Sequence, residues 1–172
     1  MCEGPNELAI INILLQNNKL IFTSDDLLNL VPYHARQIAT SSVVKTALNL
    51  YPGQVTVLRI GDKLSDTLKI PKAYIDQITD VKKYCTKPEL EMLLIITENL
   101  QKKFEKVKAK TTPKSFCKNN ICYNRQKYDN STKFYYNYYE NRVDLLISAI
   151  KCYKKLKGKH EKDELYLADL LK

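Results

Sequence analysis

The sequence predicts an α/β fold with a central, mostly parallel sheet flanked by helices and a helical C-terminal third. The first observation is the β-branched run VTVLRI at residues 55–60, which lies between two glycines and is typical of a buried strand. The second is the helical spacing of apolar residues before and after that run. The third is the alternation of strands and helices, which is typical of α/β folds.

Length and composition favour one domain. The chain has 172 residues, of which 44% are hydrophobic, and this is enough for a proper core. We expect residues 1–110 to form an α/β core and residues 111–172 a helical extension, with the change near Thr111.

The first half of the chain contains three predicted helical segments. A helix over 7–16 follows a Gly-Pro-Asn turn, with apolar residues on one face. A short segment over 25–31 begins at two aspartates that can cap it and ends before Pro32. A third helix reaches residue 50 and has Ser41 or Ser42 as its cap.

A second, weaker strand is expected at 80–85, and a long helix follows it. Pro88 suits the first turn of this helix because its missing N–H is not needed there. Leucines and other apolar residues keep one face of the helix hydrophobic to about residue 110.

The last third is rich in lysine, asparagine and tyrosine. Asn130-Ser131 is expected to cap a tyrosine-rich helix, and Asn141 to cap the next. A final short helix is predicted over 163–171. Tyr135, Tyr136, Tyr138 and Tyr139 either stack on unpaired bases or pack in the core, and we expect core packing for half of them.

Several classes of protein are excluded by composition. No apolar run approaches the roughly 20 residues that span a bilayer, and the first residues do not resemble a signal peptide, so we expect a cytoplasmic protein without membrane contact. The five cysteines lack the paired spacing of a zinc site, and we expect reduced thiols.

The charge of the chain favours a polyanionic partner. Lys plus Arg number 28 against 19 Asp plus Glu, a net charge of +9. The excess is concentrated at 101–118 and 151–162, and such stripes release counterions when they contact phosphates. A solvated helix face explains the same pattern equally well. The residues expected to contact a nucleic-acid backbone are Lys102, Lys103, Lys106, Lys110, Lys154 and Lys155.

Acidic residues from three segments are candidates for chemistry. Glu3 and Glu7 flank the first turn, Asp62 and Asp66 follow the best strand, and Glu89 and Glu91 begin the long helix. Ligands bind at the carboxyl ends of strands in open α/β sheets, so these acids are expected to converge there. Clustered carboxylates suit Mg²⁺ or Mn²⁺. The alternative is that Glu7 and Glu89 only stabilise helix starts through the helix dipole.

The sequence leaves two possible roles for each of three basic or titratable residues. His34 is either a surface histidine or an acid/base group, and Arg36 is able to clamp a phosphate with its planar fork. Arg59 either clamps a phosphate too or pairs with a carboxylate.

Two motifs resemble those of TOPRIM domains. The segment CEGPNELAIINILL is similar to the first TOPRIM motif, a strand that runs into Glu-Gly and then a second acid. The segment VTVLRIGDKLSD is similar to the second motif, although the usual Asp-x-Asp is replaced by Asp62 with the next acid at Asp66. A strand is expected before Glu3, where this sequence has only two residues.

Two further segments resemble the RloB-like branch of TOPRIM proteins. These are YCTKPELEMLLII, in which Glu91 falls in step with the branch, and RVDLLISAIKCYKKL. The resemblance implies that Glu3 is a metal ligand or general base and Asp62 the main metal ligand. It implies supporting carboxylates at Glu7, Asp66 and Glu91.

The function expected from this resemblance is metal-dependent hydrolysis of nucleic-acid phosphodiesters. Related OLD-family nucleases imply a role in defence against phage. The alternative is a non-catalytic nucleic-acid-binding or regulatory module that retains the fold, and a third candidate is a protein–protein adaptor. Either a homodimer or a partner protein is compatible with the sequence.

Overall fold

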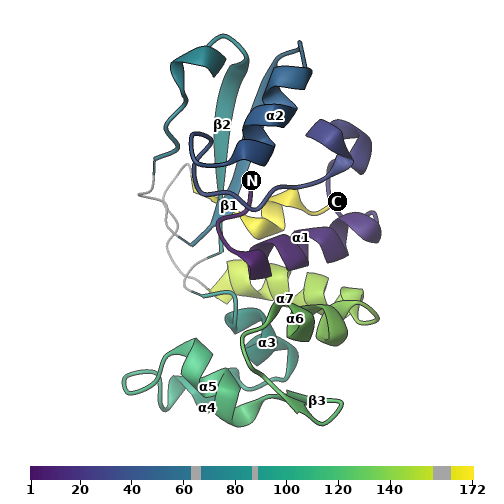
Figure 1. Ribbon diagram of the computed structural model, residues 1–172. Coiled ribbons are helices and arrows are strands. Elements are labelled where there is room, and N and C mark those ends of the chain that lie inside the picture. The colour runs from purple at the N-terminus through teal and green to yellow at the C-terminus, as the bar shows by residue number, and fades with distance from the viewer. Residues whose placement is uncertain (63–66, 87–88, 157–163) are drawn as a thin grey trace.

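Three parallel strands form the central sheet. In this computed structural model, which describes residues 1–62, 67–86, 89–156 and 164–172, the order is β1 (Val55–Gly61), β2 (Ile78–Cys85) and β5 (Leu165–Tyr166). Helices flank the sheet (Figure 1), so the predicted α/β class and the parallel strands are confirmed. Both predicted strands lie where the sequence placed them.

The N-terminal residues extend the sheet beyond β1. Cys2 forms parallel bridges with Ile60 on one side and with His34 on the other. The N–H of Glu3 donates to the carbonyl of Ile60 at 2.9 Å. The polypeptide therefore enters α1 directly from the edge of β1.

Two helices pack near this N-terminal segment. α1 (Pro5–Gln16) starts two residues earlier than predicted, and α2 (Ser42–Leu50) is capped by Ser41, whose Oγ accepts from the N–H of Val44 at 3.3 Å. The segment between them forms two 3₁₀ turns, η1 (Ser24–Asp26) and η2 (Leu28–Leu30). Another 3₁₀ turn, η3 (Lys72–Tyr74), precedes β2.

The predicted long helix over 88–110 is wrong. Two short helices, α3 (Met92–Thr97) and α4 (Gln101–Glu105), occupy part of that range, and the start at Pro88 lies outside the described residues. The break falls at Asn99, whose φ of 55° is left-handed, a conformation that asparagine tolerates better than most residues.

The region after the break contains two elements that the sequence did not predict. α5 (Pro113–Asn120) is capped by Thr112, whose Oγ1 accepts from the N–H of Ser115 at 3.2 Å. A hairpin of β3 (Cys122–Tyr123) and β4 (Gln126–Lys127) follows.

The C-terminal third is not purely helical. α6 (Thr132–Tyr139), with Ser131 as its cap, and α7 (Val143–Leu156) match the predicted helices. In place of the last predicted helix the chain forms β5 and the 3₁₀ turn η4 (Leu167–Leu170). This segment returns to the sheet because Tyr166 and Leu170 are buried against it.

Two groups of buried side chains hold the fold together. The larger contains α1, α3, α6 and α7, and the smaller lies between α2 and the outer ends of β1 and β2. Tyr135, Tyr138 and Tyr139 are fully buried in the larger group, so they pack in the core and are not available to stack on bases. Burial of such rings is a large part of the stability of this region.

Two sequence expectations concern membranes and thiols. No helix within the described ranges is long and apolar enough to cross a membrane. The five cysteines are free thiols in the structure, and four of them are buried or half-buried.

Candidate functional site

Glu3 is fixed at the carboxyl end of β1 by its backbone and its side chain. Its carboxylate forms an ion pair with the guanidinium of Arg59, and both residues are buried, at 7% and 3% exposed. The side chain lies across Gly61, where an added Cβ would overlap Glu3 Oε2. Arg59 therefore pairs with a carboxylate, and its burial removes it from the surface that a nucleic acid would contact.

Glu7 lies in the first turn of α1. Its carboxylate folds back over Gly4, where an added Cβ would overlap Oε2. Burial raises the pKa of Glu7, and its own backbone N–H lowers it in part. Asp62, Glu91 and Glu3 then raise it further through their negative charges, so these acids are close enough to repel one another.

Asp62 follows β1 directly and is exposed. Its negative charge raises the pKa of both Glu7 and Glu89. Asp66, the second acid predicted for this loop, lies outside the described residues.

Glu91 begins α3 and is 7% exposed. The hydroxyl of Tyr128 donates to its Oε1 at 2.7 Å, and burial strongly raises the pKa of this tyrosine, which therefore stays a donor. The side chain of Asn130 lies 3.3 Å from the same oxygen and 3.2 Å from Asn6 in the first turn of α1. This chain of contacts ties the start of α3 to the start of α1.

Glu89 connects the site to α5. Its Oε2 accepts from the backbone N–H of Lys114 at 3.1 Å, and burial raises its pKa despite that bond. The ammonium of Lys114 lies 2.8 Å from the side chain of Asn130. A lysine therefore stands beside the carboxylates, at the start of the lysine-rich region.

Charge effects and hydrogen bonds link the three segments that carry the predicted acids. The acids at the start of α1, at the end of β1 and at the start of α3 interact electrostatically. Two of them are already engaged, Glu3 by Arg59 and Glu91 by Tyr128. Within residues 1–62, 67–86, 89–156 and 164–172, no three His, Cys, Asp or Glu side chains are arranged to hold a metal ion.

Glu3 also lines an open hollow of about 680 Å³. Arg36 and His34 line it, and α1 and α2 both begin at its wall. Arg36 Nε donates to the carbonyl of Glu3 at 3.5 Å. Two helix N-termini and an arginine are features that favour an anion such as phosphate.

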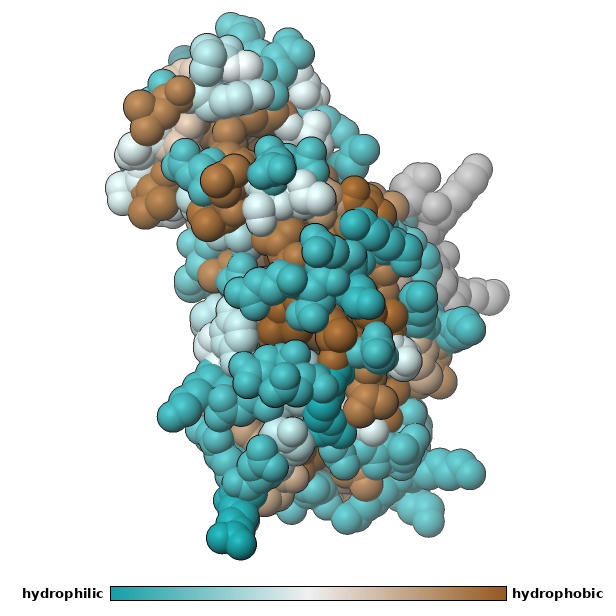
Figure 2. Space-filling view, turned by 90° about the vertical axis from the view of Figure 1, so that its right-hand side faces the viewer, coloured by the Kyte–Doolittle hydropathy of each residue, from teal (hydrophilic) through white to brown (hydrophobic). Residues whose placement is uncertain are grey.

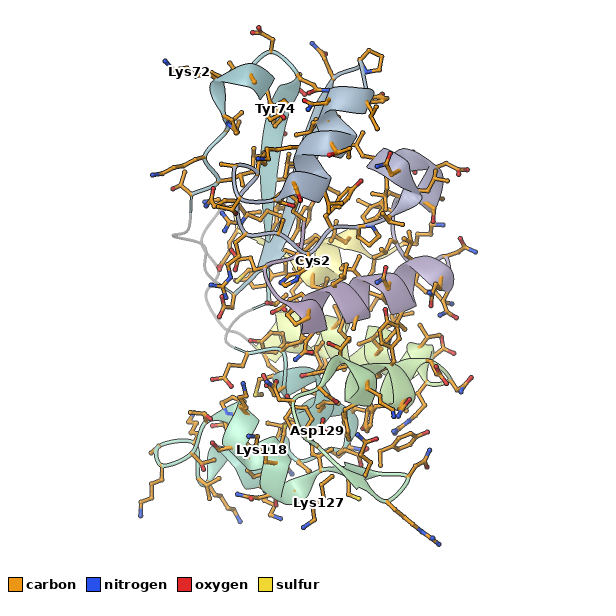
Figure 3. The ribbon with its side chains drawn as sticks, in the orientation of Figure 1. Cys2, Lys72, Tyr74, Lys118, Lys127 and Asp129 are labelled. Atoms are coloured by element: carbon orange, nitrogen blue, oxygen red, sulfur yellow. The ribbon has the colours of Figure 1, made fainter. Side chains whose placement is uncertain are left out.

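The lysines predicted to contact a nucleic-acid backbone lie on and after α4, at one end of the molecule, and on α7. Lys102, Lys106 and Lys110 are exposed on and after α4, whereas the ammonium of Lys103 donates to Asn120 at 2.6 Å. Lys118 lies in the same lower region of Figure 3, at the opposite end from Lys72. On α7, Lys155 is exposed, and Lys154 forms an ion pair with Asp169.

Sequence reasoning missed four residues of the site: Gly61, which makes room for Glu3, and the hydrogen-bonded side chains Tyr128, Asn130 and Asn6. Tyr128 is 37 residues from Glu91 in sequence, and no local pattern predicts that contact. The only available signal was the glycine after a strand, which often marks a close approach of another group.

No family model, no curated protein and no solved structure matches this chain.

Proposed function

We propose that this protein is a metal-dependent hydrolase of nucleic-acid phosphodiesters with a TOPRIM-like site. The observation that carries the proposal is the gathering of acids from α1, β1 and α3 at the carboxyl edge of the sheet. The Glu3 side chain contacts Gly61, and the Asn6–Asn130–Glu91 contacts join the other two segments. This edge is where ligands bind in open α/β sheets.

The donor chemistry at this edge fits a hard divalent cation. Carboxylate oxygens are the ligands that Mg²⁺ and Mn²⁺ prefer, and the raised pKa of Glu7 reflects burial and then negative charge that a cation would neutralise. Asp62 is exposed and Glu7 is partly exposed, so both are free to turn toward an ion, with Glu3 and Glu91 behind them. A bound Mg²⁺ would polarise a phosphate oxygen and lower the pKa of water.

The remaining residues suit the binding and orientation of a phosphate chain. The hollow beside Glu3 offers Arg36 and two helix starts to one phosphate. Lys114 contacts Asn130 and Glu89, and further exposed lysines lie on α4 and α5. Arg59 holds the Glu3 carboxylate in one orientation and is a positioning residue.

The experiment is a cleavage assay with fluorescently labelled single-stranded DNA, duplex DNA and RNA in Mg²⁺ or Mn²⁺. We expect cleavage of at least one substrate, complete inhibition by EDTA, and a decrease of about 100-fold or more in rate for Asp62→Asn, as for other groups that stabilise charge in a transition state. Asp76→Asn is the matched control, because Asp76 is an exposed acid at the far end of β2. Cleavage that persists in EDTA, or that Asp62→Asn leaves unchanged, contradicts the proposal.

A specific observation favours a second candidate, a non-catalytic nucleic-acid-binding module. Glu3 and Glu91 are both engaged by neutralising or donating partners, and the described residues contain no preformed metal site. Binding of the same labelled substrates without turnover, weakened by salt and unchanged by EDTA, would establish this alternative.

A further inference from the structure

Most of the net positive charge of the chain belongs to one end of the molecule, the basic lobe (residues 101–133). This fifth of the chain contains ten lysines and arginines and two acids, whereas the other 139 residues contain eighteen and seventeen, so the lobe carries a net charge of +8 out of +9. All ten cationic side chains are exposed. The lobe includes α4, α5 and the β3–β4 hairpin, at the lower end of the molecule in Figure 1, and Figure 2 shows a mostly hydrophilic surface over this end. Such a surface complements a polyanion.

The hairpin of the basic lobe has a strained arginine in its turn. Tyr123 pairs with Gln126, so the turn contains only Asn124 and Arg125. Their φ angles are 47° and 65°, in the left-handed region that both central residues of a type I′ turn require. Asparagine tolerates this conformation, whereas the second position favours glycine and disfavours arginine. Strained residues of this kind cluster at ligand contacts, so the position of Arg125 indicates a role for its side chain.

The base of the hairpin is held against the core. The Tyr123 ring packs edge-on against the fully buried Tyr138, with 5.1 Å between the ring centroids. The guanidinium of Arg142 lies 5.0 Å from the centre of the Tyr123 ring. Just after β4, the N–H of Tyr128 donates to the carbonyl of Ile121 at 3.0 Å. A two-stranded hairpin is marginally stable by itself, so these contacts keep the turn in a fixed position.

The cations on and beside the hairpin are available to an external anion. The side chains of Lys118, Arg125 and Lys127 are exposed and, within the described part of the chain, form no hydrogen bond or ion pair. Lys118 and Lys127 both lie at the lower end of the molecule in Figure 3. The minor groove of B-DNA is about 6 Å wide, has phosphates along both edges, and attracts arginine through its negative potential. The minor groove of duplex RNA is wide and shallow, so a single arginine on a rigid turn fits DNA better.

We propose that the basic lobe binds double-stranded DNA, with the Arg125 guanidinium in the minor groove and Lys118 and Lys127 at the flanking phosphates. The inference rests on the nucleic-acid substrate proposed above and names that substrate as duplex DNA. The hairpin holds the duplex and takes no part in the chemistry, so binding requires no divalent cation. A·T tracts are preferred because their minor groove is narrow and its potential is more negative.

The test measures the anisotropy of short, fluorescein-labelled duplexes with the full chain in EDTA. We expect tighter binding of a DNA duplex with a central A·T tract than of a G·C duplex of the same length, and weaker binding of the matching RNA duplex. Netropsin, which occupies the minor groove of A·T tracts, should compete. Equal binding of the DNA and RNA duplexes, or no effect of netropsin, overturns the proposal. Binding of the expected kind without any cleavage in Mg²⁺ supports it and contradicts only the proposed hydrolysis.

Arg125→Gly separates a DNA contact from a structural role of the arginine. Glycine adopts the left-handed turn without strain, so this variant should melt at a temperature no lower than that of the wild type. It should nevertheless bind the A·T duplex about tenfold more weakly, the effect of one lost arginine contact. Lys82→Gln, at an exposed lysine of β2, removes one charge outside the basic lobe and should bind like the wild type. Wild-type binding by Arg125→Gly, or equal weakening of the two variants, overturns the proposal.

Discussion

The Glu3 carboxylate packs directly against Gly61, so that the last residue of β1 and the glutamate that precedes α1 are in close contact. A Cβ at residue 61 would overlap Oε2 and Cδ of Glu3, and Arg59 prevents the carboxylate from moving away. We therefore predict that Gly61→Ala lowers the free energy of unfolding by about 1–3 kcal/mol, the usual effect of overpacking. Urea unfolding measures it. Gly53→Ala is the control, because the three atoms nearest to its added methyl group all belong to the exposed side chain of Tyr51. An equal decrease in the two variants would contradict the role of Glu3.

Arg59 neutralises a buried charge, and its removal should destabilise the fold strongly. Arg59→Leu leaves the Glu3 carboxylate buried without its partner, so we predict a decrease of about 3–5 kcal/mol in unfolding free energy. The double variant Glu3→Gln with Arg59→Leu should be more stable than the sum of the single effects predicts, because the unpaired charge is gone. Arg125→Leu, at an exposed arginine outside the candidate functional site, should change stability by no more than about 0.5 kcal/mol. Additive effects at residues 3 and 59 would show that the pair is not coupled.

Tyr128 is predicted to fix the position of Glu91. Tyr128→Phe removes the hydrogen bond to Oε1 of Glu91, and bonds to charged groups contribute about 1.5–3 kcal/mol. Thermal and urea unfolding should show a decrease in stability in that range. Tyr136→Phe, a half-buried tyrosine of α6, serves as the control and should be destabilised less. If Tyr128→Phe is as stable as the wild type, then hydrogen bonds to water replace the bond between the hydroxyl and the carboxylate without loss.

The elements that the sequence predicted correctly are those with local signals. A glycine-bounded β-branched run gives β1, and serine caps before apolar faces give α2 and α6. The break between α3 and α4 was missed because apolar residues continue at helical spacing across Asn99, and only its left-handed backbone ends the helix. Packing decides that conformation, and propensity is a weak guide to it.

The candidate site also divides into residues that local motifs predicted and contacts that depend on packing. Glu3, Glu7 and Asp62 were predicted from short motifs next to one strand and one helix, and the structure brings them within electrostatic reach. The engagement of Glu3 by Arg59 spans 56 residues of sequence. Such pairings depend on how the strands stack, and neither spacing nor composition contains that information.

The lysines of α4 should contribute the salt dependence of nucleic-acid binding. Lys102→Gln with Lys106→Gln removes two exposed charges from this end of the molecule. We predict that the slope of log binding constant against log salt becomes shallower by about 0.9 for each duplex phosphate that the variant no longer neutralises. Fluorescence anisotropy with a labelled duplex at several salt concentrations measures the slope. Lys69→Gln with Lys72→Gln should leave the slope unchanged, since Lys72 lies at the opposite end of the molecule from Lys118 in Figure 3. An equal change in both pairs would indicate only a net-charge effect.

Glu7 should make stability depend on pH and on divalent cations. Its pKa is raised above the ordinary value of 4.5, mainly by burial and then by the neighbouring acids, so the folded state holds the proton more tightly than the unfolded state. Its contribution to stability is therefore fully present below pH 4.5 and is lost as the pH rises through the folded pKa. We predict that Glu7→Gln, which stays neutral, is more stable than the wild type at pH 7.5 and shows no such advantage at pH 4.

Divalent cations extend the same prediction, because binding to the folded state alone raises the melting temperature. Mg²⁺ should stabilise the wild type at pH 7.5 by neutralising the charge beside Glu7, and should stabilise Glu7→Gln less. Differential scanning fluorimetry with and without Mg²⁺ measures both effects, with the exposed Glu140→Gln as the control. If Glu7→Gln is no more stable at pH 7.5 and responds to Mg²⁺ like the wild type, then the acids at this edge do not share an ion.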